Sequence, residues 1–269
     1  MLTDIMSFFA LRFHVFRPII PKLAQLAKGL ETPRLIDLCS GAGGPALAVW
    51  RAMGSGAERP LPIVLTDKYP NLAAFRRAAQ VTGGAVSYIE EPVDATDVPS
   101  ALCGFRTLFG SFHHFRPATA QAILRDAARK GQGIGVFEYT ERNLLVWALP
   151  ILLTPVFCWI VTLFLRPLTW RRVLWTYLVP VVPIIASWDG LVSCLRTYST
   201  QELRDLTEDI GCPGYRWESG RIRSFGACHV TYLLGYPLRA GVEPAAGADD
   251  SAGEARHNPN KSDIDRSAP

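Results

Sequence analysis

The sequence predicts an α/β fold with a doubly wound, mostly parallel sheet, and three observations support this prediction. Short apolar strand segments alternate with helical segments across residues 34–141. A glycine-rich turn separates the first strand segment from the first helix of this region. Two further strand segments in 215–237 form a predicted hairpin. Strand–helix–strand units with right-handed crossovers place parallel strands side by side, with helices on both faces.

The alternating elements follow one another at short intervals. Strand RLIDL, residues 34–38, precedes a helix that begins near Pro45 and ends at Gly54. The later segments are strand 61–67, helix 71–80, the extended segment 85–97, strand 106–115, helix 117–131 and strand 133–141. Ligands of such sheets bind beyond the carboxyl ends of the strands, where the glycine-rich turn is expected to lie.

The predicted hairpin follows a capped helix. Ser199 or Thr200 can cap the helix start, Glu202 completes a capping-box pattern, and Gly211 ends the helix. The segment 215–237 then carries alternating or apolar strands around residues 220–226. A dehydrogenase would continue with parallel units at this point, so an antiparallel hairpin disfavours that class.

The glycine-rich turn has the composition of a ligand-binding loop. Gly41, Gly43 and Gly44 permit positive φ and a close approach of the backbone to a ligand, and Pro45 suits the first helical position. Free N–H groups at the helix start favour a carboxylate or phosphate. A plain tight turn is the alternative interpretation.

Two ligand classes fit the residues around this turn. The letters GAGGPA match the GxGxxA form of the dinucleotide fingerprint, and Asp67 ends the second strand where a ribose-binding acid would lie. Asp37, four residues before Gly41, would repel a pyrophosphate but could face a cationic ligand. The residues alone leave both ligands open.

The segment LIDLCSGAGG, residues 35–44, resembles the first motif of the class I S-adenosylmethionine-dependent methyltransferases, in which an acid precedes GxGxG. Cys39 stands in place of the first glycine. EEPVDATD, residues 90–97, resembles the third motif of the family, and LFGSFHHF, residues 108–115, stands where the fourth strand and its loop belong. The resemblance covers residues 33–142 and 199–237. It implies a seven-stranded sheet with an antiparallel last strand, and S-adenosylmethionine as cofactor.

The same resemblance implies roles for individual residues. Asp37, Gly41 and Gly43 are expected to line the methionine portion of the cofactor, and Asp67 to bind the ribose hydroxyls. Asp94 is expected near the adenine amino group, with Ala95 alongside. The candidate cofactor-binding residues are Asp37, Cys39, Gly41, Gly43, Asp67, Lys68, Asp94 and Ala95.

An apolar insert, residues 143–198, separates the two parts of the predicted domain. Leu144–Leu165 and Val173–Ser187 carry no charged residue. The first run is long enough to cross a bilayer, but fifteen helical residues span only about 22 Å of a roughly 30 Å core, and Pro180 and Pro183 weaken the second run. We therefore expect a re-entrant or surface-lying unit, or else a soluble helical cap over the active site. The residues expected at lipid headgroups are Arg166, Arg171, Arg172, Trp170 and Trp175.

The N-terminal segment, residues 1–30, interleaves aromatic and basic side chains. This pattern is typical of an amphipathic interfacial helix, and a lid helix over the cofactor is an equal alternative. The residues concerned are Phe8, Phe9, Phe13 and Phe16 with Arg12, Arg17, Lys22 and Lys28.

Candidate catalytic residues follow the fourth and fifth strands. His113 and His114 come after the fourth strand, where one of them can serve as general base for a hydroxyl acceptor. Glu138 ends the fifth strand and competes for this role, as do Tyr139 and Glu141. Asp189 either faces the acceptor pocket or, as the Asp-Gly dipeptide favours, makes a turn.

Composition limits the remaining functional classes. The six cysteines have no metal-ligand spacing, so we expect no metal site and a reducing, cytoplasmic location at the inner face of a membrane. The segment 240–269, with six acidic and three basic residues, is expected to be disordered. Basic residues form no stripe with stacking aromatics, which disfavours nucleic acid. The insert predicts a lipophilic small-molecule acceptor.

Two other functional classes stay open from the sequence. One is an NAD(P)-dependent oxidoreductase, and the other is a non-catalytic, membrane-attached binding protein. The predicted organisation is an N-terminal helical segment (1–30), a cofactor-binding core (31–142), the insert (143–198), a helix and hairpin that complete the core (199–239), and the tail (240–269).

Overall fold

The computed structural model describes residues 2–28, 30, 32–54, 60–165, 168–224 and 228–238. Residues 1–238 form one compact unit. The predicted disordered tail and the expected headgroup residue Arg166 lie outside the described residues, as does part of the predicted turn of the hairpin.

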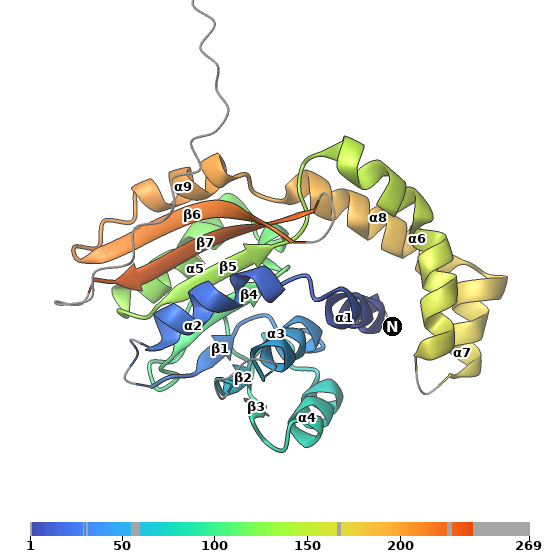
Figure 1. The fold of residues 1–269 in the computed structure, drawn as a ribbon, viewed down its shortest axis with the longest axis horizontal. Helices are drawn as coiled ribbons and strands as arrows, with labels where there is room; N and C mark the ends of the chain where they lie inside the picture. Colours follow the sequence, from blue (N-terminus) through green and yellow to red (C-terminus); the bar gives the residue numbers. More distant parts are fainter. Residues whose placement is uncertain are drawn as a thin grey trace, which may run out of the picture. The chain divides into compact units, whose positions relative to one another are not determined.

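Seven strands of the described residues form one sheet, in the order β3-β2-β1-β4-β5-β7-β6. All neighbouring pairs are parallel except those that involve β7, which runs antiparallel to β5 and β6. This confirms the predicted doubly wound, mostly parallel sheet (Figure 1). The strands are β1 (Leu35–Asp37), β2 (Ile63–Leu65), β3 (Val86–Tyr88), β4 (Phe105–Phe109), β5 (Ile134–Glu138), β6 (Tyr215–Arg223) and β7 (His229–Pro237).

The strand order reverses at β1, since β2 lies on one side of it and β4 on the other. Asp37, the last residue of β1, is level with Leu65 of β2 and Thr107 of β4. The loops that leave the carboxyl ends of β1 and β4 therefore diverge to opposite faces of the sheet. This divergence opens the crevice in which ligands of such sheets bind.

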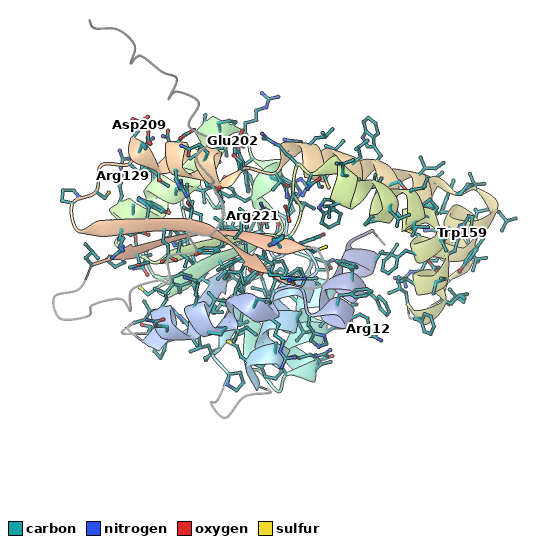
Figure 2. All side chains as sticks on the ribbon, turned by 45° about the horizontal axis from the view of Figure 1, so that its top comes forward. Arg12, Arg129, Trp159, Glu202, Asp209 and Arg221 are labelled. Carbon is teal, nitrogen blue, oxygen red and sulfur yellow. The ribbon has the colours of Figure 1, made fainter. Side chains whose placement is uncertain are left out.

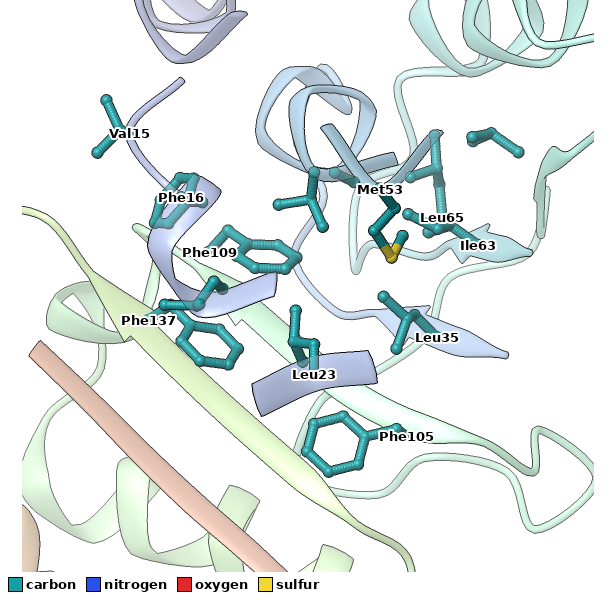
Figure 3. Packing of buried hydrophobic residues seen from close by; sticks show 14 of the residues in the cluster. Val15, Phe16, Leu23, Leu35, Met53, Ile63, Leu65, Phe105, Phe109 and Phe137 are labelled. Carbon is teal, nitrogen blue, oxygen red and sulfur yellow. The ribbon is translucent and has the colours of Figure 1, made fainter. Parts of the chain in front are cut away.

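Helices cover both faces of the sheet, each over its own apolar cluster. One cluster joins α2, α3 and α4 to the sheet and contains the aromatic and aliphatic side chains shown in Figure 3. The other joins α5 and α9 to the opposite face. The helices are α2 (Ile20–Lys28), α3 (Gly44–Gly54), α4 (Leu72–Val81), α5 (Pro117–Arg129) and α9 (Thr200–Glu208).

The C-terminal helix and hairpin form as the sequence indicates, with one shift. Ser199 and Glu202 make the expected capping box at the start of α9. β6 runs to Arg223 and β7 begins at His229, so residues 220–223 of the predicted 220–226 belong to β6, where Gly220 is paired with Tyr232. A Cβ at Gly220 would lie 2.7 Å from the Tyr232 hydroxyl, so the glycine makes room for the tyrosine.

The N-terminal segment forms two helices rather than one. α1 (Leu2–Phe13) ends at His14, whose positive φ of 52° breaks the helix, and the 3₁₀ turn η1 (Arg17–Ile19) leads into α2. Phe16 is 1% exposed and packs in the core cluster, so its expected role at a membrane interface is wrong. Ile19 and Leu23 are fully buried beside it and hold this part of the segment on the sheet.

The insert forms an apolar arm, defined here as residues 144–196. α6 (Leu144–Phe164) packs against α8 (Val181–Arg196), and α7 (Trp170–Val173) with the π-helical η3 (Leu174–Leu178) connects them (Figure 1). α8 continues through Asp189 and Gly190, so the predicted Asp-Gly turn is wrong. The arm contacts α1 through a small cluster around Ile5, Cys158, Val161 and Ala186.

Much of the arm's apolar surface is exposed. By length and composition alone, α6 is long and apolar enough to cross a membrane, and the pair η3–α8, bent by 69°, would count as a second such span. Trp159 lies on this arm in Figure 2. Exposed side chains on α6 and α8 include Leu149, Leu152, Ile160, Leu163, Phe164, Ile184, Ile185, Trp188 and Leu195.

Candidate active site at the carboxyl edge of the sheet

The loop after β1 adopts an alternating left-handed conformation. Cys39, Gly41 and Gly43 have φ values of 58°, 55° and 71°. The left-handed region is strained for a residue with a Cβ, at a cost of roughly 1–2 kcal/mol, and Cys39 nevertheless adopts it. Cys39, which stands where the motif has its first glycine, therefore adopts the backbone conformation expected of a glycine at that position.

Backbone and side-chain hydrogen bonds hold this loop on the ends of β1 and β2. Gly43 N donates to Ser40 O at 2.7 Å, and Ser40 N donates to Thr66 O at 3.0 Å. Gly41 N donates to Asp67 Oδ2 at 2.8 Å. No atom lies within 4 Å of a Cβ built on Gly41, so there is open space beside the loop there.

Three carboxylates gather around the loop, at the ends of β1 and β2 and in the segment after β3. Asp37, Asp67 and Asp94 all raise the pKa of the Cys39 thiol to about 12, although burial is the larger cause. The thiol is therefore protonated at neutral pH and is not a nucleophile. Of the three carboxylates, Asp94 is paired with a cation, Lys68, whereas Asp67 forms no ion pair with a described residue and so suits a positively charged ligand that also carries hydroxyl groups.

Asp67 and Asp94 differ in how much of their hydrogen-bonding and ion-pairing capacity is already used by other protein groups. Asp67 accepts from Gly41 N and, at 2.9 Å, from Tyr69 N, which leaves lone pairs on both oxygens. Asp94 accepts from Thr96 and pairs with Lys68 at 2.8 Å; these contacts, that of Lys68 first, lower its pKa to about 2. Lys68 therefore lies against Asp94. The side chain of Ala95 packs into the α5–α9 cluster.

Asp37 lies beneath the loop rather than on its open surface. It is 3% exposed, and its Oδ1 accepts from Thr107 Oγ1 at 3.1 Å. Burial raises the pKa of Asp37 to about 7; hydrogen bonds from Ser40 and Thr107 oppose the rise and the charge of Asp67 adds to it. The carboxyl group is thus close to half-protonated at neutral pH.

His113 and Glu138 form a buried pair between the ends of β4 and β5. His113 follows β4 in the 3₁₀ turn η2 (Phe112–His114), and its Nδ1 lies 2.8 Å from Glu138 Oε2. Glu138 Oε1 accepts from Phe112 N at 2.7 Å and from His113 N at 3.2 Å. Because a carboxylate only accepts, Nδ1 carries the proton and Nε2 is left as a base. Nε2 is buried and has no hydrogen-bond partner among the described residues.

A cavity of about 110 Å³ lies beside this pair. Its walls are mostly aromatic and apolar, and include Phe9 and Phe16 from the N-terminal segment, Phe109 and Tyr139. Pro45, in the first turn of α3 after the glycine-rich loop, also lines it. The first turn of α3, which directly follows the loop, therefore meets His113 and the aromatic walls at this cavity.

The other predicted candidates lie at different positions around this cavity. His114 lines it, with its ring centroid 4.2 Å from that of His113, and desolvation lowers the pKa of His114, so the ring is neutral at pH 7. Burial raises the pKa of Tyr139, which excludes a phenolate base. Glu141 points elsewhere: it pairs with Arg221 beside a second, larger pocket of about 470 Å³.

Asp189 also lines the cavity, from α8 of the arm. The sequence favoured a turn at this position because Asp-Gly dipeptides are common in turns. Its position nine residues into an apolar helix was the available signal, since a lone charge in such a helix marks a functional site.

The sequence matches no family model and no curated protein. The structure is similar to crystal structures of NcsB1, an O-methyltransferase from neocarzinostatin biosynthesis. For its complex with S-adenosylmethionine and 2-hydroxy-5-methyl naphthoic acid, the TM-score is 0.53 and the identity 16%, over 87% of this chain and 56% of that chain. For its complex with S-adenosyl-L-homocysteine and 1,4-dihydroxy-2-naphthoic acid, the TM-score is 0.51, with the same identity and coverage.

This similarity confirms the class I methyltransferase fold that the sequence predicts. The chain spans a little over half the length of the solved protein it matches. At 16% identity the similarity concerns the fold alone.

The raised pKa of Asp37 predicts a pH-dependent stability difference for Asp37→Asn. Folding disfavours the ionised form of Asp37 and favours the protonated form. The stability that the protonated carboxyl group contributes is complete below the unfolded pKa near 3.8 and is lost as the pH rises to about 7. The amide keeps an acceptor for Thr107 and does not titrate. In thermal melts without ligand, the melting temperature of the variant relative to wild type should therefore rise from pH 4 to pH 7 and then level off. A difference that is constant over this range would contradict the assignment.

Proposed function

We propose that this chain is an S-adenosylmethionine-dependent O-methyltransferase that acts on a lipophilic aromatic small molecule at a membrane surface. The observation that carries the proposal is the buried His113–Glu138 pair: His113 has an unpaired Nε2 and lines an aromatic cavity that Pro45, just after the glycine-rich loop, also lines. This arrangement combines a general base, a dry acceptor site and a candidate cofactor loop at one edge of the sheet.

The residues around the loop fit the proposed cofactor. Asp67 retains free lone pairs for ribose hydroxyls, and the open space at Gly41 leaves room beside the loop. The charge of Asp67, which forms no ion pair with a described residue, favours a cationic sulfonium group. When bound, S-adenosylmethionine supplies an electrophilic methyl group. The NcsB1 structures, which contain S-adenosylmethionine or S-adenosyl-L-homocysteine on the same fold, support this assignment.

His113 acts as the general base in this proposal. Glu138 fixes the Nδ1–H tautomer, and two backbone N–H groups hold the carboxylate in place, so Nε2 has a fixed direction. Nε2 accepts the proton of the acceptor hydroxyl, and the charge that then appears on the ring is stabilised by Glu138. The apolar walls exclude water, which strengthens the electrostatic interaction within the pair.

The cavity walls favour an aromatic acceptor. Phe16 packs against Phe109 at 5.2 Å between ring centroids, and Phe9 lies 5.9 Å from Tyr139. Such surfaces stack well on a flat ring and bind aliphatic chains less selectively. The naphthoic acids named for the NcsB1 complexes are ligands of this kind.

The apolar arm supports attachment to the inner face of the cytoplasmic membrane. Its exposed leucine, isoleucine and tryptophan side chains form more apolar surface than a soluble protein usually leaves uncovered. Arg171 lies against Trp170 at 5.6 Å, at the far end of the arm, in position for lipid headgroups. An arm that lies in the membrane would also give a lipophilic acceptor a route to the cavity, since α8 lines it.

The other two functions considered for this sequence are less well supported. The sheet order with an antiparallel β7 departs from the 3-2-1-4-5-6 order of dinucleotide-binding dehydrogenases. A binding protein without catalytic activity has no need of a buried histidine that is oriented by a carboxylate.

Asp67→Ala should weaken S-adenosyl-L-homocysteine binding by roughly 1.5–3 kcal/mol, because charge-assisted hydrogen bonds to the ribose are lost. Calorimetric titration measures this. Since Asp67 also accepts from Gly41 N, Asp67→Asn provides a second variant that can keep this contact. Asp97→Ala, at a carboxylate that pairs with Lys130 away from the loop, is the matched control and should bind like wild type. Unchanged affinity in a folded Asp67→Ala variant would contradict the cofactor assignment.

His113→Ala should lower kcat by roughly 10²–10⁴-fold while affinity for S-adenosyl-L-homocysteine is unchanged. Glu138→Gln should lower kcat as well, because an amide can donate to Nδ1 and so favour the wrong tautomer. His114→Ala is the neighbouring control and should have a smaller effect. Methyl transfer to a phenolic acceptor is the measurement. Full activity of His113→Ala would contradict the role of His113 as general base. Catalysis would then come from the close positioning of donor and acceptor, or from another residue.

Replacement of Arg166, Arg171 and Arg172 by glutamate should release the protein from anionic vesicles. Each lost basic contact costs about 1 kcal/mol, and the new acidic groups add repulsion. Sedimentation with phosphatidylserine-containing vesicles measures binding, and S-adenosyl-L-homocysteine affinity should be unaffected. The matched control replaces Arg129, Arg204 and Arg216, all outside the arm. If the wild-type protein stays in the aqueous phase with or without vesicles, the arm is a soluble cap.

A further inference from the structure

Asp189 is a charged residue in an otherwise uncharged stretch of the arm. Residues 173–195 contain no other acidic or basic side chain. Asp189 lies in the interior of α8, so it caps neither end of the helix. A carboxylate in such a position has no counter-ion among its neighbours in the helix, and a lone charge in an apolar helix marks a candidate functional site.

The Asp189 side chain lines the same cavity as His113 and His114. Desolvation lowers the pKa of His114, and the charge of Asp189 opposes this shift in part. Burial raises the pKa of Tyr139, and the charge of Asp189 adds to that rise. Asp189 therefore lies within electrostatic range of two residues of the cavity wall. Ser193, one helical turn later, lines the cavity as well.

No described residue donates a hydrogen bond to the Asp189 carboxylate or forms an ion pair with it. The basic residue at the end of the same helix, Arg196, instead donates to His114 O at 3.1 Å. Glu138, which holds His113 from behind the cavity wall, is by contrast satisfied by three donors. The half-buried Asp189 carboxylate thus has unused acceptor capacity that faces the proposed acceptor site.

We propose that Asp189 selects acceptors that carry a second hydrogen-bond donor beside the methylated hydroxyl, as a catechol does. This inference rests on the methyl transfer proposed above. His113 Nε2 accepts from one hydroxyl group and Asp189 accepts from its neighbour. Both side chains belong to residues that line one cavity of about 110 Å³, so a single ring bound there has His113 and Asp189 among its neighbours.

Selection follows from the cost of an unpaired carboxylate. An acceptor with a single hydroxyl group would displace water from Asp189 and offer no donor in its place. A site that hydrogen-bonds one polar group of a substrate strongly discriminates against an analogue without that group. The arm then contributes a specificity-determining residue to the site as well as a proposed membrane contact.

The test compares naphthalene-2,3-diol with 2-naphthol, which differ by one hydroxyl group. Methyl transfer gives kcat/KM for each, and calorimetry gives their affinity for the protein saturated with S-adenosyl-L-homocysteine. Wild type should prefer the diol by about tenfold or more, and Asp189→Leu should lower this ratio by about 10–100-fold, mainly through KM. Asp189→Asn, which keeps the shape and a weaker acceptor, should lower it less. Asp209→Asn, an exposed carboxylate at the end of α9, is the matched control and should keep the wild-type ratio.

The inference is overturned if wild type does not distinguish the two compounds, if it binds neither, or if both Asp189 variants keep the wild-type ratio. Should Asp189→Leu fail to fold, the Asp189→Asn result decides. The proposed function fails by different results: no binding of S-adenosyl-L-homocysteine, or binding of both naphthols without methylation of either.

Discussion

The Glu138 carboxylate is the contact on which the rest of the site depends. One of its oxygens accepts two backbone N–H groups of η2, and the other holds His113 Nδ1. It thereby joins the end of β5 to the turn that leaves β4 and fixes both the position and the tautomer of the histidine. Because the pair is buried, removal of the carboxylate would leave three donors without a partner.

The opposite side of the crevice depends on a different constraint, the shape of a backbone loop. Left-handed residues at 39, 41 and 43 turn the chain sharply after β1, and Asp67 holds the loop at Gly41 N. The loop and the histidine pair lie on either side of the switch between β1 and β4. This is the place where a parallel sheet can bring a donor molecule and an acceptor molecule together.

The apolar arm combines two features of opposite composition. The exposed side chains of α6 and α8 are largely apolar, whereas Asp189 introduces one carboxylate where α8 reaches the cavity. Phe16 shows the converse: it belongs to a segment that alternates aromatic and basic residues, yet it lies in the core, while Phe13 of the same segment is exposed. In both cases the partner surface, not the local pattern, decides what a side chain does.

The sequence by itself determined the alternation of strands and helices, the glycine-rich loop, the capped helix α9 and the antiparallel hairpin. Hydrophobic periodicity, turn residues and helix caps act between residues close together in the chain, so the local sequence encodes these features. It also located His113, His114 and Glu138 at strand ends, since the ends of parallel strands meet at one edge. Only the tertiary structure decided that His113 is the histidine held by Glu138 and that Asp189 lines the same cavity. Those facts depend on contacts between residues 25 and 76 positions apart, and no local pattern encodes such contacts.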